Sequence, residues 1–160
     1  MSVKSSSEDK EYARLLRQGA GNYVNLCGVL AGFVAVIMVL VLTPGFSPNT
    51  DTDVLFQLIL ILFSVSSFGF IITALGFVNI SSTPLRYYKS LGDMAKEYAF
   101  NQYLVILNTA GFLGGATALN FYAGTYYVGL AVAFGFLAIL YYLIRDWWAL
   151  LRRTPPKKTG

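Results

Sequence analysis

The sequence contains no histidine and a single cysteine, Cys27, and these two shortages exclude several kinds of chemistry. Without histidine the chain has no imidazole base, no histidine ligand for haem or zinc, and no Ser–His nucleophile pair. One cysteine cannot close a disulfide within the chain or hold an iron–sulfur cluster. We therefore expect no enzymatic activity, no metal and no cofactor.

Charged residues are also scarce, at 12% of 160 residues, whereas 56% are hydrophobic. A soluble domain carries about 25% charged residues. Three stretches have no charge at all, over residues 18–50, 54–85 and 98–144. Because a membrane-spanning helix needs about 20 residues, the third stretch has room for two of them. The sequence therefore predicts an all-α integral membrane protein with four transmembrane helices.

The predicted organisation follows from these stretches. The four transmembrane helices are expected at residues 24–43, 54–79, 102–122 and 126–146. An outer loop (44–53), an inner loop (80–101) and an outer turn (123–125) join them. A partly helical N-terminal segment (1–23) and a basic tail (147–160) complete the chain.

The basic residues predict the orientation in the membrane. All twelve Lys and Arg residues lie before the first helix, between the second and third, or after the fourth. Because cytoplasmic loops are enriched in Lys and Arg, both termini are expected to be cytoplasmic. In the inner loop, Thr83-Pro84 is typical of a helix N-cap followed by proline at the first helical position. Apolar residues then recur at helical spacing, which favours a short amphipathic helix at the interface over a solvated connector.

The end of the chain is basic and contains proline. Such a tail is attracted to anionic lipid head groups at the inner surface, although it can equally serve only as a topology signal. Nucleic-acid binding is not expected, because no aromatic platform accompanies the charges. The basic residues in question are Arg152, Arg153, Lys157 and Lys158.

Few polar residues lie within the predicted spans, and charged residues occur only at the very end of the fourth, at Arg145 and Asp146. Hydroxyls such as those of Ser64 and Thr73 are expected to bond their own helix backbone. Gln102 is expected near a helix end, where water or head groups can satisfy it. Asn108 lies deeper, and it either bonds across to another helix as a packing device or lines a wet path.

Small residues at four-residue spacing predict close helix contacts, because glycine lets two backbones approach each other in lipid. They either pack the four helices of one chain or contact another subunit, and the third span is the best candidate for a buried or shared interface. With Asn108, the candidate packing residues are Gly28, Gly32, Gly111, Gly114, Gly115, Ala118 and Gly135.

The first span has the pattern Leu30-x-Gly32-Phe33-x-x-Val36-x-Met38-Val39-x-Val41. This pattern resembles the pore-lining first helix of the Orai family of calcium channels, which are also four-span proteins with both termini inside. The resemblance implies an apolar gate and hinge at Gly32, Phe33 and Val36, and an inner basic pore position at Arg17. Leu40 stands where the family has its selectivity glutamate, and Asn25 stands at another inner basic position. Calcium selectivity is therefore not implied.

Two functions are compatible with these observations. The first is a non-catalytic four-helix subunit, structural or accessory, in a larger membrane protein assembly. The alternative is a homo-oligomeric pore, with Phe33, Val36 and Leu40 lining a hydrophobic gate that closes by dewetting. The expected partners are the lipid bilayer and other membrane subunits or copies of the same chain. A hydrophobic ligand between the helices is possible for any bundle, and no single residue in the sequence recommends one.

Overall fold

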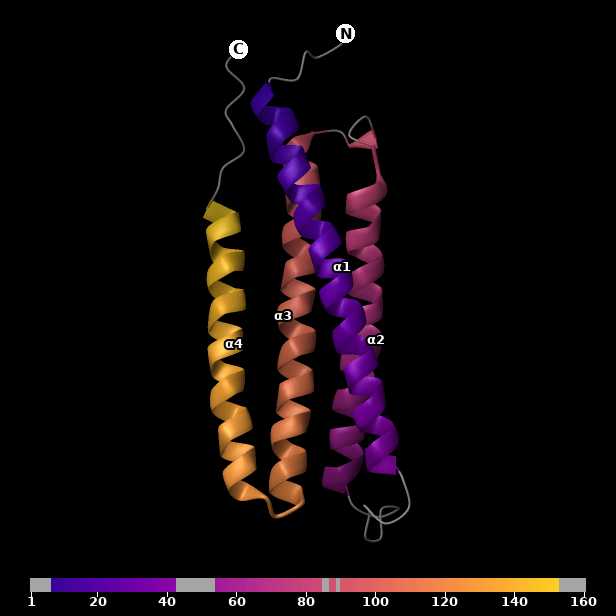
Figure 1. Ribbon diagram of the computed structural model, residues 1–160, viewed down its shortest axis with the longest axis vertical. Coiled ribbons are helices and arrows are strands. Elements are labelled where there is room, and N and C mark those ends of the chain that lie inside the picture. The colour runs from indigo at the N-terminus through magenta and orange to yellow at the C-terminus, as the bar shows by residue number, and fades with distance from the viewer. Residues whose placement is uncertain (1–6, 43–53, 85–86, 89, 153–160) are drawn as a thin grey trace.

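The computed structural model describes residues 7–42, 54–84, 87–88 and 90–152. Within these ranges the chain forms four α-helices, and Figure 1 shows them as a bundle. The predicted outer loop 44–53, together with Arg153, Lys157 and Lys158, lies outside the described residues. The helices are α1 (Ser7–Leu42), α2 (Val54–Ser82), α3 (Leu91–Tyr122) and α4 (Tyr126–Arg152).

All four helices are long and apolar enough to cross a membrane. The prediction of an all-helical chain with four membrane-spanning segments is therefore confirmed at this level. The helices extend beyond the predicted spans at several ends: α1 begins at Ser7 instead of residue 24, and α4 continues to Arg152 instead of 146. The reason is that charged residues mark where hydrocarbon ends, and they do not interrupt a helix.

The segment predicted as the inner loop, residues 80–101, differs from the prediction. The N-cap of α3 is Ser90, whose Oγ accepts a hydrogen bond from the backbone N–H of Asp93 at 3.1 Å. The expected cap at Thr83 is wrong, because the N–H of Thr83 still donates to Asn79 O, 2.9 Å away, at the end of α2. From Leu91 the helix runs without interruption into the predicted third span, so the segment before that span is part of α3.

The core follows a seven-residue repeat. In α2 a phenylalanine is buried at every seventh position, and in α1 and α3 the buried positions recur in the same way. This period is typical of helices that pack side by side at a shallow crossing angle. The repeating buried positions are Ala13, Ala20, Cys27, Val34 and Val41 in α1, Phe56, Phe63, Phe70 and Phe77 in α2, and Met94, Asn101, Asn108 and Gly115 in α3.

The four helices do not share the core equally. α1 packs on α2, α2 packs on α3, and α4 packs mainly against α3 at the edge of the bundle (Figure 1). Along α4 most side chains are exposed, and its partly buried stripe includes Val132, Phe136 and Leu140. The principal core is therefore formed by α1, α2 and α3.

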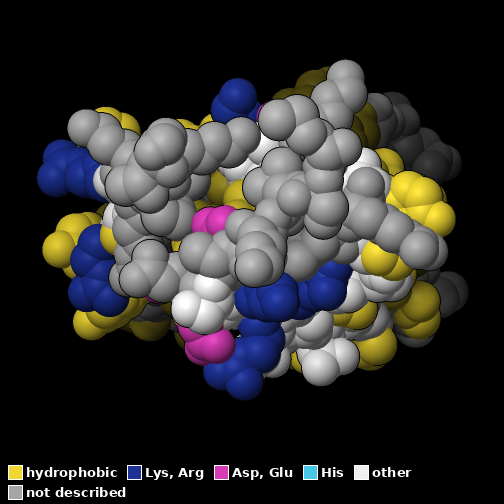
Figure 2. All heavy atoms as spheres, turned by 90° about the horizontal axis from the view of Figure 1, so that it is seen from above, with side chains coloured by type: hydrophobic (Ala, Val, Ile, Leu, Met, Phe, Trp, Pro, Cys, Tyr) yellow, Lys and Arg dark blue, Asp and Glu magenta, His cyan; other side chains and the backbone are white. Residues whose placement is uncertain are grey.

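The start of α1, the end of α4 and the α2–α3 connection lie at one end of the bundle, which we call the terminal end (Figure 1). At the other end, α3 turns into α4 through Gly124, whose φ of 74° lies in the left-handed region that glycine adopts without strain. Figure 2 looks onto the terminal end and shows Lys and Arg side chains around it. The described Lys and Arg residues all belong to this half of the bundle: Lys10, Arg14, Arg17, Lys96, Arg145 and Arg152.

Candidate functional site

The contact between α2 and α3 depends on glycines that face asparagines. A Cβ added at Gly69 would overlap the side chain of Asn108, and one added at Gly76 would overlap that of Asn101. Gly69 and Gly76 are seven residues apart, as are Asn101 and Asn108, so the same contact occurs twice along the seam. Each asparagine side chain thus lies in the notch left by a missing side chain on α2.

Asn108 is held in its notch by a hydrogen bond across the helix interface. Its Nδ2 donates to Thr73 Oγ1 at 3.2 Å, and the Thr73 hydroxyl donates to Gly69 O at 2.7 Å. Of the two roles considered for Asn108, this bond is the contact with another helix; the other role was to line a water-filled path. The Ser64 hydroxyl also donates within its own helix, to Leu60 O at 2.8 Å. The expectation that buried hydroxyls bond their own backbone is confirmed for Ser64 and Thr73.

Asn101 was not singled out from the sequence. It is 6% exposed, and its Nδ2 donates to Glu97 O, one turn earlier in α3, at 3.0 Å. The signal that could have revealed it is its seven-residue spacing from Asn108, matched by the same spacing of two glycines in the preceding helix.

The small residues predicted in the third span divide between two environments. A Cβ added at Gly111 would lie 2.6 Å from Ser66 Oγ, and one at Gly115 would lie 3.1 Å from the Phe63 ring, so both glycines pack on α2. Ala118 is partly buried against the same core. Gly114 has nothing within 4 Å of the corresponding position. Gly111 and Gly115 are therefore occupied by contacts within the chain.

Near the terminal end, three aromatic rings join α1, α2 and α3. Tyr23 stacks on Phe77 with ring centres 4.8 Å apart, and Tyr98 meets Phe77 edge-on at 5.4 Å. The Tyr98 hydroxyl lies against Gly19, where a Cβ would come within 2.5 Å of it. These contacts fix the position of Tyr23, whose hydroxyl points toward α3.

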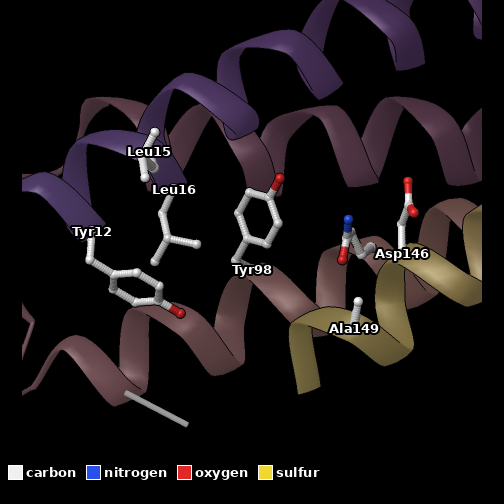
Figure 3. Close-up of a pocket in the computed structure, with 7 residues that line it drawn as sticks. Tyr12, Leu15, Leu16, Tyr98, Asp146 and Ala149 are labelled. Atoms are coloured by element: carbon white, nitrogen blue, oxygen red, sulfur yellow. The ribbon is translucent and has the colours of Figure 1, made fainter. Parts of the chain in front are cut away.

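A crevice with a volume of about 390 Å³ opens beside these rings, between α1, α3 and α4 (Figure 3). Its walls combine aliphatic, aromatic and polar groups from all three helices. Figure 3 shows Tyr12, Leu15 and Leu16 on one side and Asp146 and Ala149 on the other, with Tyr98 between them. Gln102 completes the lining.

Gln102 is the buried polar group of this crevice. Only 8% of the residue is exposed, which contradicts the expectation that it lies at a solvated helix end. The expectation was wrong because α3 begins at Leu91, which places Gln102 well inside the helix. Its Nε2 donates to Tyr23 OH at 2.8 Å, whereas its Oε1 is buried without a hydrogen-bond partner.

A second polar group of side chains lies at the terminal end of the three-helix core. Arg17 donates from Nη2 to Thr83 O at 2.8 Å, and Asn79 donates from Nδ2 to Glu97 Oε1 at 3.1 Å. Tyr88 lies in the same cluster, and burial together with the negative charge of Glu97 raises its pKa above the usual value of 10.0. These contacts tie the start of α1 to the α2–α3 connection.

The residues predicted to line a pore lie on the outer side of α1. Phe33, Val36 and Leu40 are 56%, 58% and 62% exposed. The rings of Phe33 and Phe112 of α3 form a T-shaped pair with their centres 6.1 Å apart. The structure therefore places Val36 and Leu40 on the open side of α1, whereas Phe33, although largely exposed, reaches the buried Phe112.

Three predicted packing glycines also lie on open surfaces. At Gly28 and Gly32 in α1, and at Gly135 in α4, a Cβ would meet nothing within 4 Å. These positions pack on no other part of the chain that the structure describes. Arg152, from the predicted head-group set, is exposed at the end of α4, where its guanidinium lies 5.1 Å from the centre of the Trp148 ring.

The described residues contain no group of three or more His, Cys, Asp or Glu side chains that could hold a metal ion. Comparison with known proteins finds no protein-family model, no curated protein and no solved structure that matches the chain. The residues and their geometry are therefore the basis for any functional proposal.

Proposed function

We propose that the protein is a non-catalytic four-helix subunit, structural or accessory, of a larger membrane protein assembly. The observation that carries the proposal is the contrast between two sets of glycines. Gly111 and Gly115 are used to pack α3 on α2, whereas Gly28 and Gly32 form an open surface on α1. Because small residues let a second helix approach closely in lipid, this open surface suits contact with another membrane helix.

The proposed orientation has both termini in the cytoplasm. It is supported by the described basic residues, which all lie in the terminal half of the bundle, and by the positive-inside tendency of membrane proteins. In this orientation the terminal end meets the inner head groups. Exposed Arg152 and the basic residues that follow it then contribute about 1 kcal/mol each to the attraction of anionic lipids.

The decisive experiment replaces Gly28 and Gly32 together by leucine. The chain is extracted gently from its own membrane and weighed by native mass spectrometry. The wild type is expected in a complex larger than 17.6 kDa, and the variant as a single chain of that mass. Val65→Leu is the matched control. Val65 is also exposed, on α2, and it is not part of a pair of glycines four residues apart. If the double variant keeps the complete assembly, the proposal is wrong.

The alternative is a homo-oligomeric pore in which α1 surrounds the axis. It is favoured by the outward position of Phe33, Val36 and Leu40, which copies of α1 could present to one another. A pore within a single chain has no support, because phenylalanine side chains fill the centre of the bundle. The likeness to the first helix of the Orai family belongs to this alternative and remains a prediction.

The two proposals differ in mass and in conduction. Masses at integer multiples of 17.6 kDa favour the pore, and a mass explained only by other chains favours the accessory subunit. In liposomes, Val36→Ser is expected to increase cation leak, because a polar ring holds water in a hydrophobic constriction. Absence of flux from a folded oligomer, with or without the substitution, would contradict the pore.

A further inference from the structure

Two arginines on the outer side of α4 each lie over an aromatic ring of the preceding turn. The guanidinium carbon of Arg145 is 4.9 Å from the centre of the Tyr142 ring, and that of Arg152 is 5.1 Å from the centre of the Trp148 ring. All four residues are exposed, and we call them the arginine stripe. The attraction between a cation and a ring face holds each guanidinium in place and leaves its N–H groups available to an anion.

The arginine stripe faces away from the rest of the bundle. Arg145 and Arg152 are seven residues apart, which is close to two helical turns, so they lie on the same side of α4. The partly buried positions of α4, among them Leu140 and Trp147, lie on the opposite side and pack toward α3. In a membrane the two arginines are therefore directed toward lipid, where a charged group is costly unless it meets an opposite charge.

The contact between α3 and α4 sets the depth of the arginine stripe in the membrane. Trp147 Nε1 donates to Ala99 O at 3.0 Å, and the two helices run in opposite directions (Figure 1). Arg152 is therefore level with the charged first turns of α3, and Arg145 is level with the start of the uncharged stretch 98–144. The stripe thus spans the boundary where a bilayer has its phosphate groups and where Trp and Tyr are enriched.

The charge of the stripe is positive even when the neighbouring acid is counted. Asp146 Oδ1 lies 3.4 Å from Arg145 Nη2, and this ion pair is exposed on both sides, so it contributes little. Among the residues that the structure describes, Arg152 has no ion pair. The planar guanidinium donates two parallel hydrogen bonds to phosphate oxygens. Two arginines on one side of a helix therefore suit a phosphate group that has no cation beside it.

We propose that the arginine stripe is a binding site for the head group of an anionic glycerophospholipid. Arg145 and Arg152 donate hydrogen bonds to its phosphate oxygens. The acyl chains lie along Phe134 and Leu137, which are 69% and 59% exposed on the same side of α4, and this apolar surface favours a lipid over a free phosphate ion. The site is on a different helix from the Gly28–Gly32 surface, so it does not depend on the assembly proposed above.

The test measures lipid binding by native mass spectrometry of the full chain in detergent micelles. Phosphatidylglycerol and phosphatidylcholine with identical acyl chains are titrated separately, and the ratio of their apparent Kd values gives the preference for the anionic lipid. We expect the wild type to prefer phosphatidylglycerol about 25-fold, because each arginine close to an anionic head group contributes about fivefold to the affinity. Equal Kd values for the two lipids would overturn the proposal.

Substitutions of exposed side chains locate the site. Arg145→Gln and Arg152→Gln are each expected to reduce the preference to about fivefold, and the double variant to abolish it. Arg14→Gln combined with Lys96→Gln is the matched control, because it also removes two exposed positive charges from the terminal end but leaves α4 unchanged. Asp146→Asn removes the acid next to Arg145 and should raise the preference about twofold. If the control loses as much as the double arginine variant, the attraction is diffuse and the proposal is wrong.

Two further measurements separate the stripe from other sources of binding. Replacing Arg153, Lys157 and Lys158 together by glutamine removes three charges from the basic chain end and leaves the stripe intact. This variant should keep most of the 25-fold preference, and its loss would refute the site on α4. Glycerol phosphate at millimolar concentration and constant ionic strength should not displace phosphatidylglycerol, because it has no acyl chains to lie along α4. Displacement would overturn the proposal of a lipid site.

Discussion

Replacing Gly69 by alanine tests the packing of α2 on α3 most directly. The added methyl group would overlap the buried Asn108 side chain, and overpacking of this kind costs about 1–3 kcal/mol. If Asn108 moves aside, its bond to Thr73 is lost as well, which costs about 0.6–2 kcal/mol in a membrane helix pair. The higher helix propensity of alanine compared with glycine offsets about 1 kcal/mol of this loss. We therefore expect a net loss of about 0.6–4 kcal/mol.

The assay is reversible unfolding of the detergent-solubilised chain in a titration with dodecyl sulfate, followed by circular dichroism. Gly114→Ala is the matched control on α3, because a Cβ at Gly114 meets nothing within 4 Å. It is expected to be neutral or slightly stabilising. A loss of stability that is the same for both alanine variants would refute the reasoning.

A double-mutant cycle separates the overlap from other effects. Asn108→Ala removes the side chain that the new methyl group would meet, so Gly69→Ala should then cost far less. The double variant is expected to be at least 1 kcal/mol more stable than the sum of the single changes predicts. Strict additivity would show that the methyl group added at Gly69 does not meet the side chain of Asn108.

Three further predictions concern the ends of the bundle. Gly124→Ala should cost about 1–2 kcal/mol in the same titration, because its φ of 74° is strained for any residue with a Cβ. Trp147→Phe should cost about 1 kcal/mol and increase protease access to α4, because Trp147 Nε1 donates to Ala99 O at 3.0 Å. The raised pKa of Tyr88 means that the folded chain holds the phenol proton more tightly than the unfolded chain. Stability should therefore fall as the pH rises above 10, and Tyr88→Phe should reduce this fall in unfolding midpoints measured between pH 9 and pH 11.

Much of the fold could be predicted from charge placement alone. Long uncharged stretches locate the four helices because buried charges are costly in hydrocarbon. The helix ends were less predictable: Ser7 and Leu91 begin helices that carry several charges before they become apolar. At these ends local capping decides the boundary, and Ser90 was a better cap than Thr83 because it lies next to the acidic first turn of α3.

The candidate sites were predictable only where they depend on spacing within a helix. Gly111 and Gly115 pack on α2, but their spacing in the sequence does not tell which helix they meet. The notch for Asn108 is formed by Gly69 on another helix, and this pairing depends on the register between α2 and α3. The crevice around Gln102 was not predictable, because it is formed by the place of α4 relative to α1.

The edge position of α4 also bears on how the chain is made. Because α1, α2 and α3 are synthesised first, the buried positions of their seven-residue repeats can pack together before α4 leaves the ribosome. α4 then joins a bundle that is already packed, and it docks chiefly on its immediate predecessor. The short turn through Gly124 keeps α4 beside α3.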